Sequence, residues 1–108
     1  MRIQFTLNGE PVSAEPLAKQ AQAEGGPGQI TITGSGGAPH EKVDIVITRQ
    51  SDSTVVFNKM LTLDNNGNGV VTVSEYDGHP LTAGTYKVAI TAHAPGGDYF
   101  YEFLETVT

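Results

Sequence analysis

Residues 85–92 read Thr-Tyr-Lys-Val-Ala-Ile-Thr-Ala, an alternating pattern that is typical of a β-strand. From Tyr86 onward every second residue is apolar, and side chains two positions apart lie on the same face of a strand. One face of this strand is therefore expected to line a hydrophobic core. The expected inward-facing set is Tyr86, Val88, Ile90 and Ala92.

Comparable alternation recurs on both sides of this stretch. The further predicted strands are residues 2–7, 29–34, 42–50, 54–63, 70–74 and 99–107. The expected inward-facing residues of the middle strands are Ile30, Ile32, Val43, Ile45, Ile47, Val55, Phe57, Leu61, Leu63, Val71 and Val73, with a bulge near Lys59 and Met60. The strands follow one another at about ten residues with no long helix between them, which favours antiparallel pairing because parallel crossovers are longer. The predicted fold is an all-β, Ig-like, two-sheet antiparallel sandwich of about seven strands.

The first 28 residues differ in composition from the rest. After the predicted strand 2–7 and the turn signal Asn8-Gly9, the chain becomes rich in Ala, Gln and Pro and closes with Gly25-Gly26-Pro27-Gly28. We interpret 1–28 as an N-terminal strand and an extended arm or linker, which carries at most a short strand or a helical turn between 16 and 24. Residues 29–108 are interpreted as the sandwich.

The segment 76–92 resembles bacterial immunoglobulin-like and fibronectin type III-like modules. It reads Tyr-Asp-Gly-His-Pro-Leu-Thr-Ala-Gly-Thr-Tyr-Lys-Val-Ala-Ile-Thr-Ala. An aromatic-Asp-Gly followed by Leu-x-x-Gly-Thr-Tyr is similar to the Ig-like module of the flagellar hook-capping protein. The resemblance covers roughly residues 29–104, and it implies that Tyr86 is a corner residue whose hydroxyl bonds to nearby backbone. It implies architecture, because modules of this kind serve in adhesins, enzyme spacers, flagellar parts and tailed-phage virions.

Composition excludes several classes of function. The chain of 108 residues has twelve acidic against six basic residues, a net charge of −6 and no basic cluster, so we expect no nucleic-acid partner. There is no cysteine, so the sandwich is expected to hold by packing alone. No apolar stretch approaches the length of a membrane span, and the N-terminus lacks the pattern of an export signal.

One loop matches a calcium-binding pattern in its letters. Residues 64–75 place Asp64, Asn66, Asn68 and Glu75 at the oxygen-ligand positions of an EF-hand loop, with Gly67 at the turn. An EF-hand needs flanking helices, whereas the flanks here are rich in β-branched residues that favour strands. We interpret the loop as a polar hairpin turn and expect no cofactor. A calcium ion bound by the loop stays as the alternative.

No arrangement of residues predicts catalysis. His40, His79 and His93 lie in separate loops or strand ends without the spacing of metal ligands. Glu102 and Glu105 are an odd number of residues apart on one strand, so they point to opposite faces and do not flank one bond. No nucleophile elbow or phosphate-binding glycine loop is present. The expectation is a protein that is not an enzyme.

Two apolar stretches are candidate interaction residues. The final strand alternates so that Tyr99, Tyr101 and Phe103 share one face, opposite Phe100 and Leu104. One face should belong to the core, and the other is either an interaction patch or a cover for the N-terminal strand. The candidate interaction residues are Ile3, Phe5, Leu7, Tyr99, Tyr101 and Phe103.

The leading functional hypothesis is a non-enzymatic structural or interaction protein, and within that class a virion component of a tailed phage. A capsid decoration protein or a tail or baseplate accessory protein would dock on a capsid or tail assembly, or on a second copy, through its arm or an exposed sheet edge. Its location would be the virion, or the host cytoplasm during assembly. The alternative is one module, calcium-stabilised at 64–75, of a secreted adhesin or carbohydrate-active enzyme at the cell surface.

Overall fold

The computed structural model describes residues 6–7, 10–11 and 20–108, and these residues form strands and loops without a helix. The strands are β1 (Thr6–Leu7), β2 (Glu10–Pro11), β3 (Gln20–Gly26), β4 (Gln29–Ser35), β5 (Lys42–Arg49), β6 (Thr54–Thr62), β7 (Gly69–Val73), β8 (Gly84–Ala94) and β9 (Gly97–Val107). None of the described residues forms a helix that could cross a membrane.

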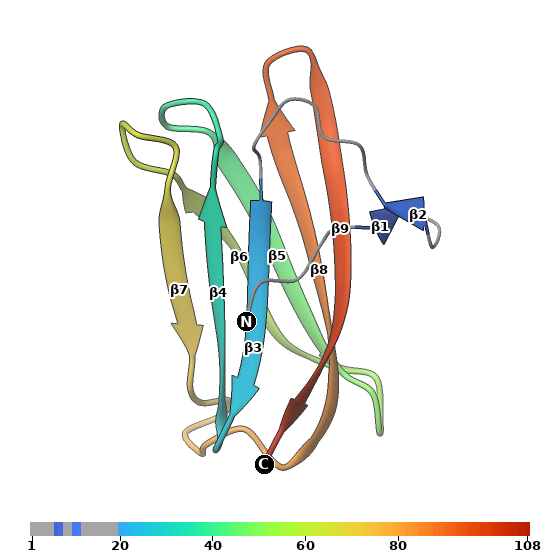
Figure 1. The fold of residues 1–108 in the computed structure, drawn as a ribbon. Helices are drawn as coiled ribbons and strands as arrows, with labels where there is room; N and C mark the ends of the chain where they lie inside the picture. The colour runs from blue at the N-terminus through green and yellow to red at the C-terminus, as the bar shows by residue number, and fades with distance from the viewer. Residues whose placement is uncertain (1–5, 8–9, 12–19) are drawn as a thin grey trace.

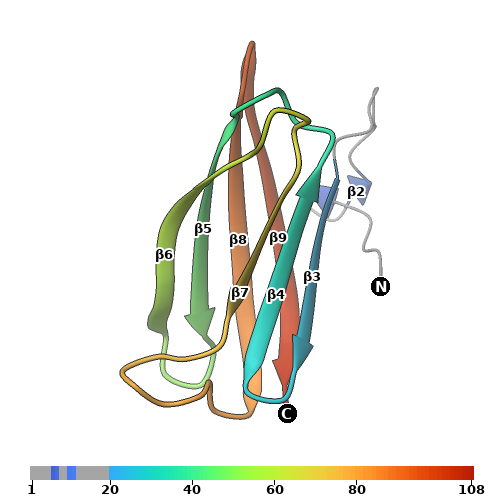
Figure 2. The same ribbon diagram turned by 90° about the vertical axis from the view of Figure 1, so that its left-hand side faces the viewer.

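Seven of these strands make a two-layer sandwich. One sheet has the order β3-β4-β7 and the other the order β6-β5-β8-β9, and every pairing within them is antiparallel. Figure 1 shows the smaller sheet in front of the larger one, and Figure 2 shows the two layers after a turn of 90°. The prediction of an all-β, Ig-like, two-sheet antiparallel sandwich is confirmed.

The core lies between the two sheets and follows the alternation of the sequence. Inward-facing residues of β4, β5 and β8 are buried, while their neighbours along each strand are more exposed. The buried residues predicted in these strands are Ile30, Ile32, Val43, Ile45, Ile47, Tyr86, Val88, Ile90 and Ala92. Their phase is confirmed, because one buried face per strand imposes a period of two on the sequence.

Tyr86 forms the corner that the resemblance implied. Its side chain is completely buried, and its hydroxyl donates a hydrogen bond of 2.7 Å to the backbone carbonyl of Thr82. The Thr82 hydroxyl oxygen lies 3.1 Å from the Tyr86 hydroxyl oxygen. This contact ties the loop before β8 to the core.

The segment 20–26 is a correction to the predicted arm. It forms β3, which pairs with β4 along its whole length and places Ala21 and Ala23 in the core. The sandwich therefore begins at Gln20 within the described residues, nine residues before the predicted boundary at 29. Of the two alternatives for this stretch, the short strand is right and the helical turn is wrong for residues 20–24. Alanine and glutamine give a weak strand signal, but the small side chains of β3 fit where this strand packs close to β9.

The phase of β6 is a second correction. Val55 was expected to face inward, but it is exposed and Val56 is buried instead. The pairing with β5 shifts between Ile47 and Thr48, so that Val56 is the extra residue of a bulge. The bulge was expected near Lys59 and Met60. One extra residue in a strand moves the side chains before it to the opposite face of the sheet. The predicted face is therefore wrong only at the start of β6, before Phe57.

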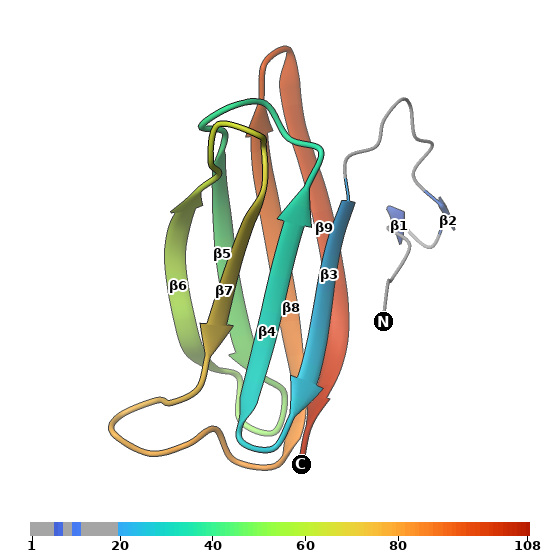
Figure 3. The same ribbon diagram turned by 60° about the vertical axis from the view of Figure 1, so that its left-hand side comes forward.

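The two long sides of the sandwich differ, as Figures 1 and 3 show. On one side β3 meets β9 at a junction that we call the seam, made by Gly25, Gly26, Gly28, Glu105 and Thr108. Across it the Thr108 amide donates to the Gly26 carbonyl at 3.1 Å, and the Gly28 amide donates to the Thr108 carbonyl at 3.2 Å. The Gly25 amide donates to Oε1 of Glu105 at 3.2 Å. The seam therefore closes the core on this side.

On the other side β6 and β7 leave a groove between the sheets. It is lined by Ile45, Phe57, Lys59, Met60, Leu61 and Val71. Lys59 lies opposite the buried Ile45 in the β5–β6 ladder. Its side chain is therefore on the core-facing side of the edge strand β6, although it remains exposed to solvent. A bulge and an inward-pointing charge are two devices by which edge strands avoid pairing with other chains.

The N-terminal hairpin stands outside the sandwich. β1 pairs with β2 in the register Leu7↔Glu10, and β1 lies next to β9. Figure 1 shows β1 and β2 beside β9 and outside the layer formed by the smaller sheet. Of the strand predicted at 2–7, only Thr6 and Leu7 fall within the described residues, and Ile3 and Phe5 lie outside them.

Candidate interaction surface

The outer face of the larger sheet carries several of the exposed large apolar side chains among the described residues. We call it the docking face and define it by the outward-facing residues Asp44, Val46, Thr48, Asn58, Met60, Lys87, Ala89, Thr91, His93, Asp98, Phe100, Glu102 and Leu104. The ladder arranges them in cross-strand rows. One row runs Met60–Asp44–Thr91–Phe100, and the next runs Asn58–Val46–Ala89–Glu102.

Large apolar side chains on the docking face are open to solvent. The exposed fractions are 55% for Phe100, 64% for Leu104 and 54% for Met60. Val46 and Ala89, in the centre of the sheet, are half-buried by their neighbours. Exposed aromatic and aliphatic side chains on a sheet face make it a candidate for binding another protein.

The outer face of the smaller sheet is polar by comparison. Thr31 and Thr72 lie side by side on it with their hydroxyl oxygens 3.3 Å apart, and Gln22 and Glu24 extend it over β3. Val70 is its exposed large apolar residue among those described. The two faces thus come from the same alternating strands but differ in what they can bind.

Two of the three residues of β9 that were predicted to contact a partner are buried in the core instead. Tyr101 and Phe103 are 5% and 7% exposed and belong to the core, so neither offers a surface to a partner. Tyr99 is exposed and stacks on Tyr101 with ring centroids 6.4 Å apart. The large apolar residues of β9 that reach solvent on the sheet face are Phe100 and Leu104. The sequence showed the two alternating sets but could not show which one met the other sheet.

Three strands bring a histidine and two aspartates together at one end of the docking face. Nε2 of His93 lies 2.7 Å from Oδ2 of Asp44, and its Nδ1 lies 3.1 Å from Oδ1 of Asp98. These two carboxylates raise the pKa of His93, with the contact to Asp44 first and that to Asp98 second. Sequence reasoning missed this cluster, because only the register of β5, β8 and β9 makes these distant positions neighbours.

An ion pair lies two rows further along the docking face. Nζ of Lys87 is 3.8 Å from Oε2 of Glu102, and both side chains are largely exposed. Such a pair contributes little to stability because water screens it. It leaves the middle of the face close to neutral between Phe100 and Leu104.

The four candidate calcium ligands are not brought together. Asp64 precedes β7 and Glu75 follows it, so the five residues of that strand, roughly 16 Å long, separate them. Oδ1 of Asp64 accepts hydrogen bonds from the amides of Asn66 and Asn68 at 2.8 and 3.0 Å, which lowers the pKa of the Asp64 carboxyl. The loop is therefore a turn capped by an aspartate, but the prediction of a hairpin is wrong, because β6 and β7 belong to different sheets.

Other candidate chemical groups are scattered over the described part of the chain. His40 lies in the β4–β5 loop and His79 in the β7–β8 loop, at opposite ends of the sandwich. Glu102 points outward while Glu105 turns to the seam, which confirms that the two lie on opposite faces. Within residues 6–7, 10–11 and 20–108, no three His, Cys, Asp or Glu side chains are placed to share a metal ion.

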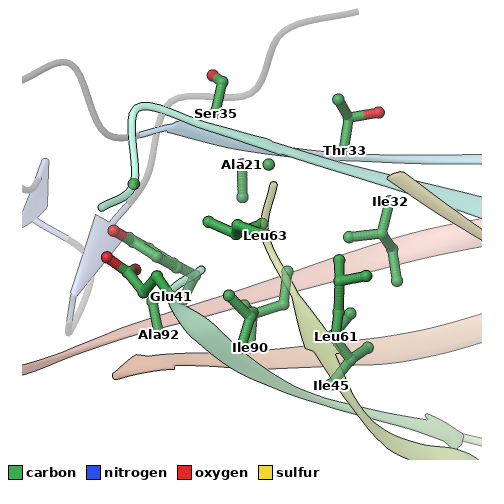
Figure 4. Close-up of a pocket in the computed structure, with 14 residues that line it drawn as sticks. Ala21, Ile32, Thr33, Ser35, Glu41, Ile45, Leu61, Leu63, Ile90 and Ala92 are labelled. Carbon is green, nitrogen blue, oxygen red and sulfur yellow. The ribbon is translucent and has the colours of Figure 1, made fainter. Parts of the chain in front are cut away.

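A small cavity lies inside the sandwich near the β4–β5 loop. Figure 4 shows Glu41 at one end of it and Ile45 and Leu61 at the other, with Leu63 reaching into the space between. Its volume is about 30 Å³, enough for little more than a water molecule. Glu41 is buried there and accepts a hydrogen bond of 2.9 Å from the Ala38 amide. The cavity is too small to be a ligand site.

Comparisons with known proteins support the fold and leave the function open. No protein family model and no curated protein matches the sequence. A family 76 glycoside hydrolase from a bovine Bacteroides thetaiotaomicron strain resembles this structure with a TM-score of 0.52 and 13% identity, over 83% of this chain and 20% of that chain. The CARDB domain of a Pyrococcus furiosus protein, determined with di-metal ions, gives a TM-score of 0.40 and 17% identity, over 83% and 89%. This chain thus spans about a fifth of the glycoside hydrolase, and that likeness is one of fold.

Proposed function

We propose that this domain is a non-enzymatic interaction protein that binds a protein partner through its docking face. The observation that carries the proposal is the exposure of Phe100, Leu104 and Met60 on one sheet face, while the opposite outer face is polar. Exposed aromatic and aliphatic side chains of this kind supply much of the free energy of association when a partner covers them.

The structure favours a sheet face over a sheet edge as the docking element. The edge of β6 carries a bulge and Lys59, and part of the β9 edge is covered at the seam by β3. β7, the remaining edge of the smaller sheet, has only five residues. Short, bulged or covered edges pair poorly with added strands.

For the partner we retain the class that the sequence suggested, a capsid or tail protein of a tailed phage. An acidic, cysteine-free single sandwich suits a decoration or accessory protein, which needs a stable scaffold and one adhesive surface. The alternative is a module of a larger secreted adhesin or carbohydrate-active enzyme. In that case the same docking face would pack against a neighbouring domain of the same polypeptide.

The test is binding by the double variant F100S/L104S, with V70S as its matched control on the opposite outer face. If the neighbouring genes encode capsid or tail proteins, as the proposal requires, those proteins are immobilised in turn and offered each purified domain. We expect one of them to bind the wild type and V70S equally, and the double variant at least about tenfold more weakly. All three positions are exposed, so the melting temperatures should remain close to one another.

Two outcomes contradict the proposal. Equal binding of F100S/L104S and the wild type removes the docking face from the interaction. If none of the neighbouring virion proteins retains the wild type, the phage assignment fails. Binding to a flanking domain of the same polypeptide, again sensitive to F100S/L104S, would then support the alternative.

A further inference from the structure

We propose that His93, when it is protonated, links β5, β8 and β9 at one end of the docking face, through a side-chain cluster that we call the staple. The staple consists of His93 on β8, Asp44 on β5 and Asp98 on β9, with contacts of 2.7 Å and 3.1 Å to the two ring nitrogens. Three adjacent strands of the larger sheet are therefore joined through one side chain.

The staple needs the charged form of the ring. A neutral imidazole has one N–H donor and one lone pair, so it can donate to only one of the two carboxylates. The other carboxylate would then face a lone pair at hydrogen-bond distance, which is repulsive. Imidazolium donates from both nitrogens and adds opposite charge to both contacts. Protonation of His93 therefore allows both hydrogen bonds of the staple, and deprotonation breaks one of them.

The surroundings of His93 leave the two aspartates in control. On β5 the charged neighbours are Asp44 and Lys42, the latter directly opposite His93 in the ladder, and on β9 the neighbour is Asp98. Lys42 opposes protonation, but its side chain is exposed to solvent, whereas both carboxylates lie within hydrogen-bond distance of the ring. Thr62 of β6, which pairs with Lys42, carries no charge.

The consequence for stability follows from the sign of the shift. The pKa of His93 is raised in the folded domain, so the stabilisation is fully present below the pKa of an unfolded histidine, about 6.5. It is lost as the pH rises through the folded value. The contribution of His93 to the free energy of unfolding is therefore larger in mildly acidic solution than in alkaline solution.

The consequence for binding rests on the proposed function. Phe100 lies two residues beyond Asp98 on the same face of β9, so the staple borders the exposed aromatic ring. When His93 is neutral, Asp44 and Asp98 lose the cation between them, and this end of the docking face becomes more negative. The affinity of a partner covering Phe100 would therefore change with pH around the titration of His93.

The primary test uses the isolated domain and needs no partner. The ring protons of His93 are followed by NMR against pH in the folded domain and in urea, for the wild type, D44N and D98N. We expect the folded midpoint to lie above the unfolded one, and each variant to lower it, D44N by more than D98N. Equal folded and unfolded midpoints, or a midpoint unmoved by both variants, would overturn the staple.

A second measurement separates the staple from a purely structural role of His93. Melting temperatures are recorded between pH 5.5 and 8 for the wild type and H93Q, with H79Q as the control histidine outside the docking face. The fall in melting temperature with pH should be smaller in H93Q than in the wild type and unchanged in H79Q. An identical fall in H93Q would contradict the proposal. Neither measurement depends on F100S/L104S binding, so the staple and the docking function can fail separately.

Discussion

The two long sides of the sandwich solve the same problem in opposite ways. Each side exposes the gap between two sheets, through which water could reach the core. At the seam, β3 and β9 approach until their backbones share hydrogen bonds, and Gly25 has no room for a side chain. On the groove side, β6 and β7 stay apart, and Lys59 and a bulge face the opening.

The difference teaches where this fold relies on backbone geometry and where it relies on side-chain chemistry. The seam depends on small residues and main-chain hydrogen bonds, so it should tolerate almost no added volume. The groove depends on a charge that keeps other chains away, so it should tolerate volume but not the loss of polarity. Three substitutions test this contrast.

Gly25→Ala should have the largest effect. A Cβ at this position would collide with the backbone carbonyl oxygen of Thr106, so β3 or β9 must move and the seam hydrogen bonds must weaken. We expect a loss of about 3 kcal/mol in the free energy of unfolding, measured by urea denaturation. Gly26→Ala is the matched control, because a Cβ there meets nothing within 4 Å, and it should change stability by less than about 0.5 kcal/mol. Equal losses in both variants would mean that the seam is not tightly packed.

Lys59→Val should leave the fold intact but change how the domain behaves in solution. Valine removes the charge from an apolar groove beside two sheet edges, so we expect association at concentrations where the wild type has a single size. The free energy of unfolding should change by less than about 1 kcal/mol. Light scattering against concentration measures the effect, and Lys59→Gln, which loses the charge but stays polar, is the control. A Val variant that behaves like the Gln variant would show that Lys59 does not guard the edge.

Glu105→Gln should give the smallest change. Burial raises the pKa of the Glu105 carboxyl against the lowering contact from the Gly25 amide, so the folded domain favours its protonated form. That contribution is present below the pKa of an unfolded glutamate, about 4.3, and is lost as the pH rises through the folded value. Glutamine keeps an oxygen for the amide without the charge. We therefore expect the free energy of unfolding to fall less in the variant than in the wild type between pH 4 and pH 7. An equal fall in both proteins would contradict the raised pKa of Glu105.

Much of the larger sheet could be predicted from the sequence. The strands around Ile45 and Val88 are regular, and each has one buried face, so alternation alone gives their phase. Tyr86 was placed by a resemblance and found at its corner. The predicted number of strands was also right, but it included the stretch 2–7 and omitted β3.

The rest depended on contacts between segments that are far apart in the chain. β3 contains small residues, alanine and glycine, where it packs against β9. Its own sequence does not show that contact, so the strand could not be predicted from it. Val55 and Val56 are equally apolar, and only the shifted pairing with β5 decides which one is buried. The docking face and the His93 cluster likewise follow from which side of β9 meets the other sheet and from the register of three strands.

The seam also has a consequence for the order in which the domain assembles. It joins Gly25 to Glu105, which are separated by 80 residues, whereas the β8–β9 hairpin joins neighbours across a short turn. Closing so long a loop costs conformational entropy before any contact is gained, so the hairpin should form early and β3 should dock late. The contact between the two sheets that forms last in folding would then be the one that seals the core from water.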